Sequence, residues 1–341
     1  MFGLDISERA IRAIKLVKKG KKMYLESFNQ LAITEGIISD GQIIDNTKFV
    51  SAITTLLKKA HGKPIKDRMV VSVLPESNTF IKVITVPVVE EKKFPEAINE
   101  EIEKHIPLEI DEIYLDWQPL KKTTSATRLL VGAAPKQIVD NYVVALDACG
   151  LTISALEIEA AAIIRTLITK ETNGATMLID FGAMRTGLAL YDHGSIQLTV
   201  SLPISGNRIT KTIAQKLNLD WDKAEKAKIV CGLDPQKCEG ALLKILVENI
   251  NSLITEIKKT ATFYQANFEN PRPVSEIILC GGGANFSSID EVLSEQLKVA
   301  IKIGNPLENV VMRNRAQIPA KEALSYTTAI GLAIRAAQNK I

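Results

Sequence analysis

The sequence predicts an α/β fold made of two similar halves, because one pattern of strands and turns occurs twice. In the segment 177–200 an apolar run ends on Asp180, a turn containing Gly182 follows, and in–out alternation resumes before a second turn at 192–194. The N-terminus repeats this order, with Asp5 ending the first apolar run and Gly20 in the second turn. Each copy is typical of three consecutive strands, and two copies in one chain indicate two homologous halves.

The two acids at the ends of these first strands are candidate Mg²⁺ ligands. A carboxylate just before a tight turn can reach a metal ion while the N–H groups of the turn face phosphate oxygens. A surface hairpin whose aspartate accepts hydrogen bonds from the turn is the simpler explanation of a single copy. Two facing halves would place Asp5 and Asp180 in one cleft, so the repetition favours a functional site.

Composition narrows the class further. A length of 341 residues suggests two domains, and 24% charged residues with a net charge of +3 are ordinary and do not favour a nucleic-acid partner. No apolar run approaches the roughly 20 residues of a membrane span, and the N-terminus has no signal-peptide core. The spacing of Cys231 and Cys238 fits no zinc site. We therefore expect a cytoplasmic, reduced α/β protein.

The rest of the first half completes the order βββαβ. Asp45 or Asn46 can cap a helix whose apolar positions continue to residue 57, and this helix should end near Gly62. The segment 69–74 is almost entirely apolar, which is typical of a strand covered on both faces.

The segment 75–156 differs from the repeated strand pattern, which indicates an insert. It predicts a strand at 80–86 that Pro87 ends, a helix at 94–105 that Ile106 and Pro107 stop, strands at 113–120 and 128–134, a helix at 136–148 and a strand at 152–158. It contains no group of residues typical of a catalytic or metal site, so we expect the insert to make contacts with something else. Packing against the core and self-association remain alternatives.

The second half offers three further candidate ligand contacts. A turn at 203–207 precedes a helix and is either a phosphate contact or a plain connection. Glu225 and Lys228 share one helix face, where they either bind a ribose or form an exposed ion pair. A buried strand runs into Gly281, Gly282 and Gly283, a turn on which a flat ligand can lie against the backbone. An alanine-rich helix at 159–169 and a long helix at 242–268 read as scaffolding.

Taken in order, these motifs resemble the nucleotide-binding elements of the actin, Hsp70 and FtsA superfamily. The motifs are DIS at Asp5, DFGAMRTG at Asp180, LPISGN at Leu202, AEKAK at Ala224, CGGGANF at Cys280 and TAIGLA at Thr328. The insert segment HIPLEIDEIYLDWQPL resembles the PilM family, the FtsA-like proteins of type IV pilus machines. The resemblance implies an actin-like (ribonuclease H-like) fold of duplicated βββαβα domains with a central nucleotide cleft. The halves would be 1–175 and 176–341, with a 1C-type α+β subdomain inserted at 75–156, a small subdomain at about 216–270 and a final helix at 323–341 packing toward the first half.

The resemblance also implies ATP and Mg²⁺ as ligands. Asp5 and Asp180 would hold Mg²⁺ through water. The implied nucleotide contacts are Ser7, Gly182, Ala183 and Thr186 for the phosphates, Gly206 and Asn207 for the terminal phosphate, Glu225 and Lys228 for ribose and base, and Gly281, Gly282 and Gly283 for adenine. The chain departs from the family pattern at Ser7, Glu8 and Arg9, where Glu8 brings a carboxylate toward the phosphates. Since the turn at 205–207 also has no Gln or Glu to orient a water, we expect slow or no ATP hydrolysis.

By resemblance, the chain would be a cytoplasmic ATP-binding protein of type IV pilus assembly. A PilN-like partner would recruit it to the inner membrane by placing its N-terminal tail in a groove lined by 80–86 and 113–120. One alternative is an FtsA-like division protein, which should end in an amphipathic membrane helix that is not evident before Lys340 and Ile341. A scaffold without nucleotide is a second alternative. A third alternative, a sugar or acetate kinase of this fold, would need an acceptor pocket with a catalytic base in the insert, and the sequence of the insert offers no candidate for that base.

Overall fold

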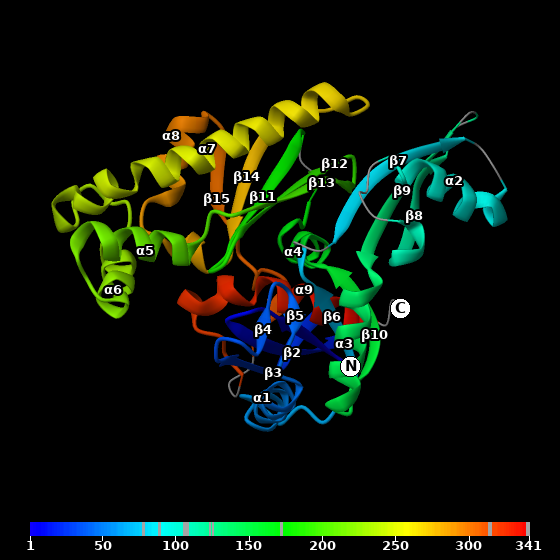
Figure 1. The fold of residues 1–341 in the computed structure, drawn as a ribbon, viewed down its shortest axis with the longest axis horizontal. Coiled ribbons are helices and arrows are strands. Elements are labelled where there is room, and N and C mark those ends of the chain that lie inside the picture. Colours follow the sequence, from blue (N-terminus) through cyan, green and yellow to red (C-terminus); the bar gives the residue numbers. More distant parts are fainter. Residues whose placement is uncertain are drawn as a thin grey trace.

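The chain folds into two halves that face each other, with the insert extending from one side (Figure 1). The computed structural model describes residues 1–341 except 77–78, 88–89, 105–108, 123, 125, 171–172, 313–315 and 339–341. The first half is built on a sheet in the order β10-β6-β1-β2-β3-β16. Its strands are β1 (Phe2–Ile6), β2 (Ala10–Lys19), β3 (Lys22–Ala32), β6 (Met69–Leu74), β10 (Thr152–Ile158) and β16 (Val310–Val311).

The second half repeats the first strand for strand, as the duplicated pattern predicts. Its strands β11 (Ala175–Phe181), β12 (Thr186–Asp192), β13 (Ser195–Leu202), β14 (Val274–Cys280) and β15 (Ala300–Ile303) follow the order β15-β14-β11-β12-β13. In both halves the first three strands are antiparallel and the next two run parallel to the first. Even the register is repeated, because Asp5 lies opposite Arg12 and Asp180 lies opposite Gly187.

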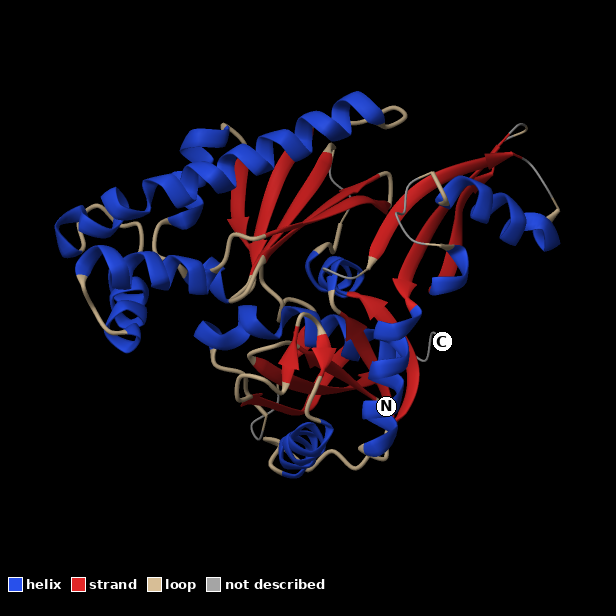
Figure 2. Ribbon diagram, viewed as in Figure 1, coloured by secondary structure: helices blue, strands red, loops and turns tan. Residues whose placement is uncertain are grey.

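Helices cover both faces of the first sheet (Figure 2). One apolar core packs the sheet against α1 (Asn46–Lys58) and α3 (Lys136–Ala148). On the other face, α9 (Thr327–Gln338) lies against β1 and β2 and beside α4 (Glu159–Leu167). A side chain at Gly3 would collide with the α9 backbone at Ala329 and Ala333. The expected C-terminal helix therefore does pack onto the first half.

The second sheet is covered mainly by α7 (Ala241–Asn267), which crosses it at the top of Figure 1. The helices α5 (Gly206–Leu217) and α6 (Trp221–Cys231) form the tip farthest from the insert, and α8 (Ile289–Leu297) packs on α7. Outside the strands and the α-helix of the insert, the other described elements are β4 (Ile38–Ser39), β5 (Gln42–Ile43) and the short 3₁₀ helices at Glu91–Lys93, Ile110–Glu112, Cys238–Gly240, Gly282–Asn285 and Ala320–Tyr326.

The insert continues the second sheet and does not stand apart from it. Its strands β7 (Phe80–Pro87), β9 (Ala126–Pro135) and β8 (Ile113–Lys122) join β13 through the single pair Leu198–Lys82, and α2 (Phe94–Ile102) covers them with a small core of its own. The expected end of the insert at residue 156 falls inside β10, because β10 pairs with β6 in the first sheet. The helix α2 ends at Ile102, not at 105, and the expected stop at Ile106 and Pro107 lies outside the described residues.

Two further findings concern expectations from composition. Cys231 and Cys238 form a disulfide, so the expectation of a fully reduced chain is wrong for this pair. The spacing of the two cysteines correctly argued against a zinc site. It did not predict that the chain turns back after α6 and brings Cys238 to Cys231. Within the described ranges, we find no helix that is long and apolar enough to cross a membrane.

Candidate functional site

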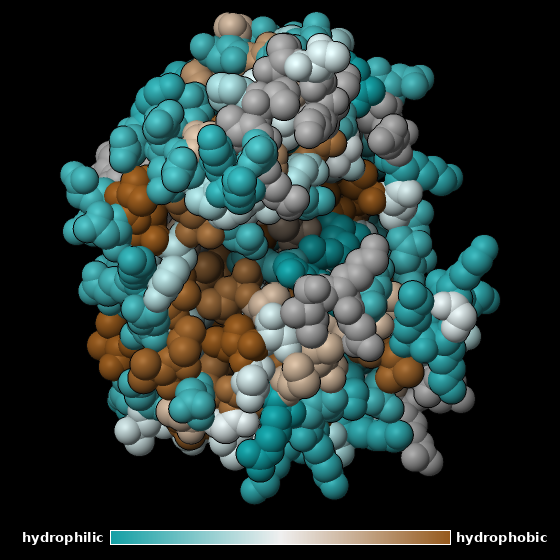
Figure 3. All heavy atoms as spheres, turned by 90° about the vertical axis from the view of Figure 1, so that its right-hand side faces the viewer, coloured by the Kyte–Doolittle hydropathy of each residue, from teal (hydrophilic) through white to brown (hydrophobic). Residues whose placement is uncertain are grey.

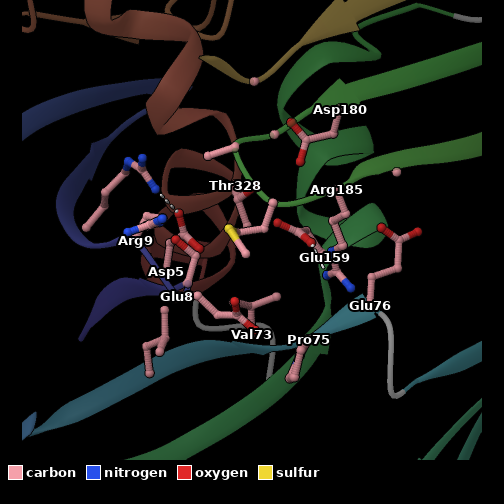
Figure 4. Close-up of a pocket in the computed structure, with 18 of the residues that line it drawn as sticks. Asp5, Glu8, Arg9, Val73, Pro75, Glu76, Glu159, Asp180, Arg185 and Thr328 are labelled. Carbon is pink, nitrogen blue, oxygen red and sulfur yellow. Dashed lines mark hydrogen bonds and ion pairs between the residues drawn. The ribbon is translucent and has the colours of Figure 1, made fainter. Parts of the chain in front are cut away.

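A cavity of about 230 Å³ lies between the two halves, and both halves contribute to its walls. Figure 4 shows Asp5, Glu8 and Arg9 on one side of it and Asp180, Arg185 and Glu76 on the other. The two aspartates thus line one cavity, as the repeated pattern predicts. The ends of the first strands of both halves and the turns that follow them supply many of the lining residues, and the end of β6, the start of α4, the glycine-rich turn and the segment 324–328 supply others.

Asp5 is buried beside a cation. Arg12, which lies opposite it on β2, places Nη1 3.1 Å from Asp5 Oδ2, and the Arg12 Nε donates to Gln30 at 2.8 Å. Burial raises the pKa of Asp5 to about 6, although the charge of Arg12 opposes this shift. A divalent cation in the cavity would stabilise the ionised carboxylate and reverse the rise.

Asp180 has a different neighbour at the equivalent place. The residue opposite it is Gly187, and a Cβ at Gly187 would collide with Glu76 Oε2. Burial, followed by the negative charge of Glu159, raises the pKa of Asp180 to about 7 and the pKa of Glu76 to about 8. Glu76, which follows β6 of the first half, is 7% exposed, so a buried carboxyl lies against Gly187, the partner of Asp180, whereas the partner of Asp5 is Arg12.

Glu159 and Arg185 form an ion pair inside the cavity. Glu159 begins α4, and Arg185 closes the turn between β11 and β12; the Arg185 Nη2 donates to Glu159 Oε2 at 3.0 Å. The cavity holds two further carboxyl groups that the sequence analysis did not assign to it, because Glu76 and Glu159 both line it. Glu8 also lines the cavity, as expected, and accepts a hydrogen bond from the Gly41 N–H at 3.2 Å.

The turn after Asp180 can present backbone donors to a ligand. The Gly182 N–H donates to the Arg185 carbonyl at 2.9 Å, which closes the turn, while the N–H groups of Ala183 and Met184 have no backbone partner among the described residues. Ser7 closes the equivalent turn of the first half, donating to the Ala10 carbonyl from its N–H at 3.1 Å and its Oγ at 2.9 Å. Ser7, Gly182 and Ala183 all line the cavity.

The expected contacts to the terminal phosphate lie behind this turn. The N–H groups of Gly206 and Asn207 donate to the carbonyls of Gly182 and Ala183, at 3.0 and 2.9 Å. The Thr186 hydroxyl, fully buried, donates to the Ile204 carbonyl at 2.7 Å. Gly206, Asn207 and Thr186 are therefore outside the cavity lining, and their contacts with phosphate stay predictions that require this turn to move.

Glu225 and Lys228 brace α6 against α5. The Lys228 Nζ lies 2.6 Å from Glu225 Oε2 and donates to the Thr210 hydroxyl at 2.8 Å and to the Gly206 carbonyl at 3.2 Å. The pair is thus part of a network that reaches the start of α5, and neither residue lines the cavity. Ribose or base binding by the two residues stays a prediction.

The glycine-rich turn does reach the cavity. Gly281 and Gly282 line it, and Gly281 has a φ of +77° and lies so close to Asp180 that a Cβ would collide with Oδ1. Around Gly282 there is open space, which suits a ligand lying on the backbone. Gly283 instead packs on the ring of Phe181, so its role is close packing.

Sequence reasoning missed Arg12, Glu76 and Glu159 as residues of the cavity, and it gave no role to Arg185 and Thr328, although both stand in the quoted motifs. A signal existed for Glu76, because it follows the apolar strand β6 closely, as Asp5 and Asp180 follow their apolar runs. No local pattern distinguished Glu159 at the start of an alanine-rich helix.

The structure limits how Mg²⁺ could bind. In the described residues no cluster of three or more His, Cys, Asp or Glu side chains could hold a metal ion. Mg²⁺ commonly keeps several waters and binds one or two carboxylates together with phosphates, so Asp5 and Asp180 fit an ion that arrives with a nucleotide.

A family model described as type IV pilus assembly protein PilM matches residues 3–337. The chain belongs to the PilM family. Among curated relatives of this PilM-family chain, cell division protein FtsA of Neisseria meningitidis serogroup B is 26% identical over 226 residues, which are 60% of the chain and 53% of that protein. FtsA of Borreliella burgdorferi is 30% identical over 162 residues, 42% of the chain and 39% of that protein. The chain spans about half the length, or less, of these relatives.

Solved structures agree with an actin-like fold. The PilM–PilN type IV pilus biogenesis complex matches with a TM-score of 0.85 at 23% identity, covering 98% of both chains. The protein MreB5 of Spiroplasma citri bound to AMPPNP matches with a TM-score of 0.57 at 14% identity, covering 99% of this chain and 96% of that one. The expected actin-like α/β fold class is confirmed.

Proposed function

We propose that this chain binds Mg-ATP in the cavity between its halves, as an actin-like component of type IV pilus assembly. The observation that carries the proposal is that two repeated strand–aspartate–turn units converge on one cavity, together with the open backbone of Gly282. The solved MreB5 relative was bound to AMPPNP, which supports a nucleotide in this fold. ATP would supply the phosphates that complete the Mg²⁺ coordination of Asp5 and Asp180.

Titration with ATP, with and without Mg²⁺, tests this proposal. Asp180→Ala should weaken Mg-ATP binding tenfold or more, since about 1.4 kcal/mol, one tenfold step in affinity, is within what one metal contact supplies. Asp234→Ala is a matched control, because Asp234 belongs to the same half but does not line the cavity. Equal affinity of the parent and Asp180→Ala would refute the assignment, and a parent without nucleotide binding would favour the scaffold alternative.

Slow hydrolysis stays a prediction, now with a different physical reason. Glu159, the cavity carboxylate at the start of α4, is bonded to Arg185 in this structure, so it can orient a water only where that ion pair is broken. Glu76 is buried with a raised pKa, so it is mostly protonated at neutral pH. Phosphoryl transfer depends on positioned charge, so we expect turnover far below the roughly 1–100 per second of kinases, measured as phosphate release.

We also propose that the tail of a PilN-like protein binds this chain and brings it, as a cytoplasmic protein, to the inner membrane. The solved PilM–PilN complex supports such a partner for the family. Hydrophobic side chains gather beside a hollow on the face that carries the insert (Figure 3). Exposed apolar residues of this part of the chain include Tyr114 on β8 and Val143 and Val144 on α3.

Two places beside the insert compete for the tail. One is the groove predicted at 80–86 and 113–120, although β9 lies between these two strands; Tyr114 on β8 represents this place, and its hydroxyl donates to Asp140 on α3 at 3.2 Å. The other is a cavity of about 320 Å³ between β7, β13 and α7, marked by Phe263, which is 54% exposed. An extended peptide would gain main-chain and apolar contacts in either groove.

Single substitutions separate the two grooves. Deleting 75–156 would remove α3, which packs on the first sheet, and most of β10, which belongs to that sheet, so it would not test the insert alone. We expect Tyr114→Ala to weaken capture of a synthetic PilN-like tail about tenfold, and Phe263→Ala to leave it unchanged. Val230→Asp, on an exposed position of α6, is the control. A loss only in Phe263→Ala would move the tail to the other groove, and no binding by the parent would refute the partner.

A further inference from the structure

Arg185 stands in a turn whose backbone does not require an arginine. The turn is closed by the Gly182 N–H donating to the Arg185 carbonyl at 2.9 Å. In the first half the Ser7 N–H donates to the Ala10 carbonyl in the same way, five residues after Asp5 as Arg185 is five residues after Asp180. Because Ala10 closes the equivalent turn of the first half, forming the turn does not require the guanidinium of Arg185.

Among the residues that the structure describes, the guanidinium of Arg185 is only partly bonded. Its Nη2 donates to Glu159 Oε2 at 3.0 Å, and its side chain is 25% exposed. By contrast, Arg165 donates from both terminal nitrogens to Glu157 at 2.7 Å and also reaches the Gly331 carbonyl at 3.0 Å. Arginine carries five N–H donors in a fork that matches phosphate, so Arg185 keeps donors that can turn toward a ligand in the cavity.

The charges around Arg185 set up a competition. Glu159, Glu76 and Asp180 line the cavity beside it, and Arg185 lowers the pKa of Glu76 and Asp180, against the larger effect of burial. These carboxylates would repel the phosphates of a nucleotide in the cavity, unless a cation lies between them and the phosphates. Arg185 lies on the same turn as Ala183 and Met184, whose N–H groups have no backbone partner in the described part of the chain and suit an anion.

We propose that Arg185 binds the outer phosphates of the nucleotide and that its ion pair with Glu159 is a latch that those phosphates must displace. This inference rests on the proposed nucleotide site and adds to it the residue that recognises phosphate charge. When phosphate takes the guanidinium, Glu159 loses its partner and becomes free inside the cavity. Phosphate binding would thus determine whether the Glu159 carboxylate is paired with Arg185 or unpaired.

The two partners of the latch have opposite expected effects on affinity. Arg185→Ala should weaken Mg-ATP binding about tenfold, weaken Mg-ADP binding less, and leave adenosine binding unchanged, because only the phosphates meet the guanidinium. Glu159→Gln should strengthen Mg-ATP binding a few-fold, because Arg185 then has no carboxylate to leave. Arg185→Ala should cost more affinity in the Glu159→Gln background than in the parent.

Titration calorimetry of the full chain with Mg-ATP, Mg-ADP and adenosine measures these differences. The control pair is Lys302→Ala and Glu276→Gln, which breaks a 2.8 Å ion pair of the same half outside the cavity and should change no affinity. Arg185→Lys keeps the charge but loses the fork, and it should fall between Arg185→Ala and the parent. Melting of each ligand-free variant shows whether it is folded.

Several outcomes would overturn the latch. If the parent binds Mg-ATP and Arg185→Ala binds it equally well, Arg185 is not a phosphate ligand. If Arg185→Ala does not fold, Glu159→Gln decides: weaker or unchanged Mg-ATP binding contradicts the displacement. Equal losses for ATP and adenosine would show that the pair only ties the turn to α4. A parent that binds no nucleotide would overturn the proposed function as well, and this result is distinct from the others.

Discussion

Glu76 shows how one buried carboxyl can make the stability of this protein depend on pH. Burial raises its pKa from 4.5 to about 8, so the folded protein keeps a proton that the unfolded chain has already lost. The free energy of unfolding therefore falls as pH rises through this window, by at most about 1.4 kcal/mol per pH unit. Below about pH 4.5 the Glu76 carboxyl is protonated in both the folded and the unfolded state, so it no longer makes the free energy of unfolding depend on pH.

Glu76→Gln should remove this pH dependence. The amide cannot ionise, so the difference in melting temperature between variant and parent should move in favour of the variant as pH rises from about 5 to about 8. Any cost of burying the amide is the same at every pH and appears as a constant offset. Melting curves across this range test the prediction, with Glu100→Gln on the exposed face of α2 as control. A difference that does not vary with pH would contradict it.

At the scale of elements, the disulfide closes a short loop between α6 and α7. Cys231 ends α6, and the chain from Gly232 to Cys238 packs on the segment that follows the glycine-rich turn. The Leu233 N–H donates to the Ser287 carbonyl at 2.9 Å, and the Lys237 Nζ lies 3.0 Å from the Ser287 hydroxyl. The loop therefore links the helix of Glu225 and Lys228 to the turn of Gly281 and Gly282.

Opening this disulfide should destabilise the second half. A loop this short gives about 2.5 kcal/mol in the chain-entropy account of disulfides. A reductant should lower the melting temperature of the parent and increase hydrogen exchange at 232–240, and Cys238→Ser should show both changes without a reductant. Since Cys238→Ser has no disulfide, adding reductant should change it no further. Identical melting of the parent with and without reductant would argue that the two thiols are not bonded.

At the scale of the whole molecule, duplication explains where the cavity lies. Two sheets with the same strand order present their Asp turns to each other, and α9 and α4 fill the space behind them. A ligand that contacts both Asp5 and Asp180 would bridge the halves, so its binding energy would oppose their separation. The strands β7, β9 and β8 of the insert extend the second sheet toward the side of the molecule, away from this cavity (Figure 1).

The sequence alone was enough to predict the duplicated α/β fold and the two aspartates. Hydrophobic periodicity and strand-ending acids are local signals, and they occur twice in the same order around Asp5 and Asp180. The insert's strands and the final helix were also evident, since each has its own pattern of apolar residues and breakers.

Only the tertiary structure decided which groups share the cavity and which are bonded elsewhere. Glu76, Glu159 and Arg185 are 26 or more residues apart, and their meeting depends on how β6, α4 and the β11–β12 turn pack. Conversely, Thr186, Gly206 and Lys228 match a nucleotide motif, yet each is hydrogen-bonded within the second half. Local patterns specify strands and turns because those depend on neighbours in sequence. Ion pairs, buried charges and the Cys231–Cys238 bond depend on distances in space, which the fold alone sets.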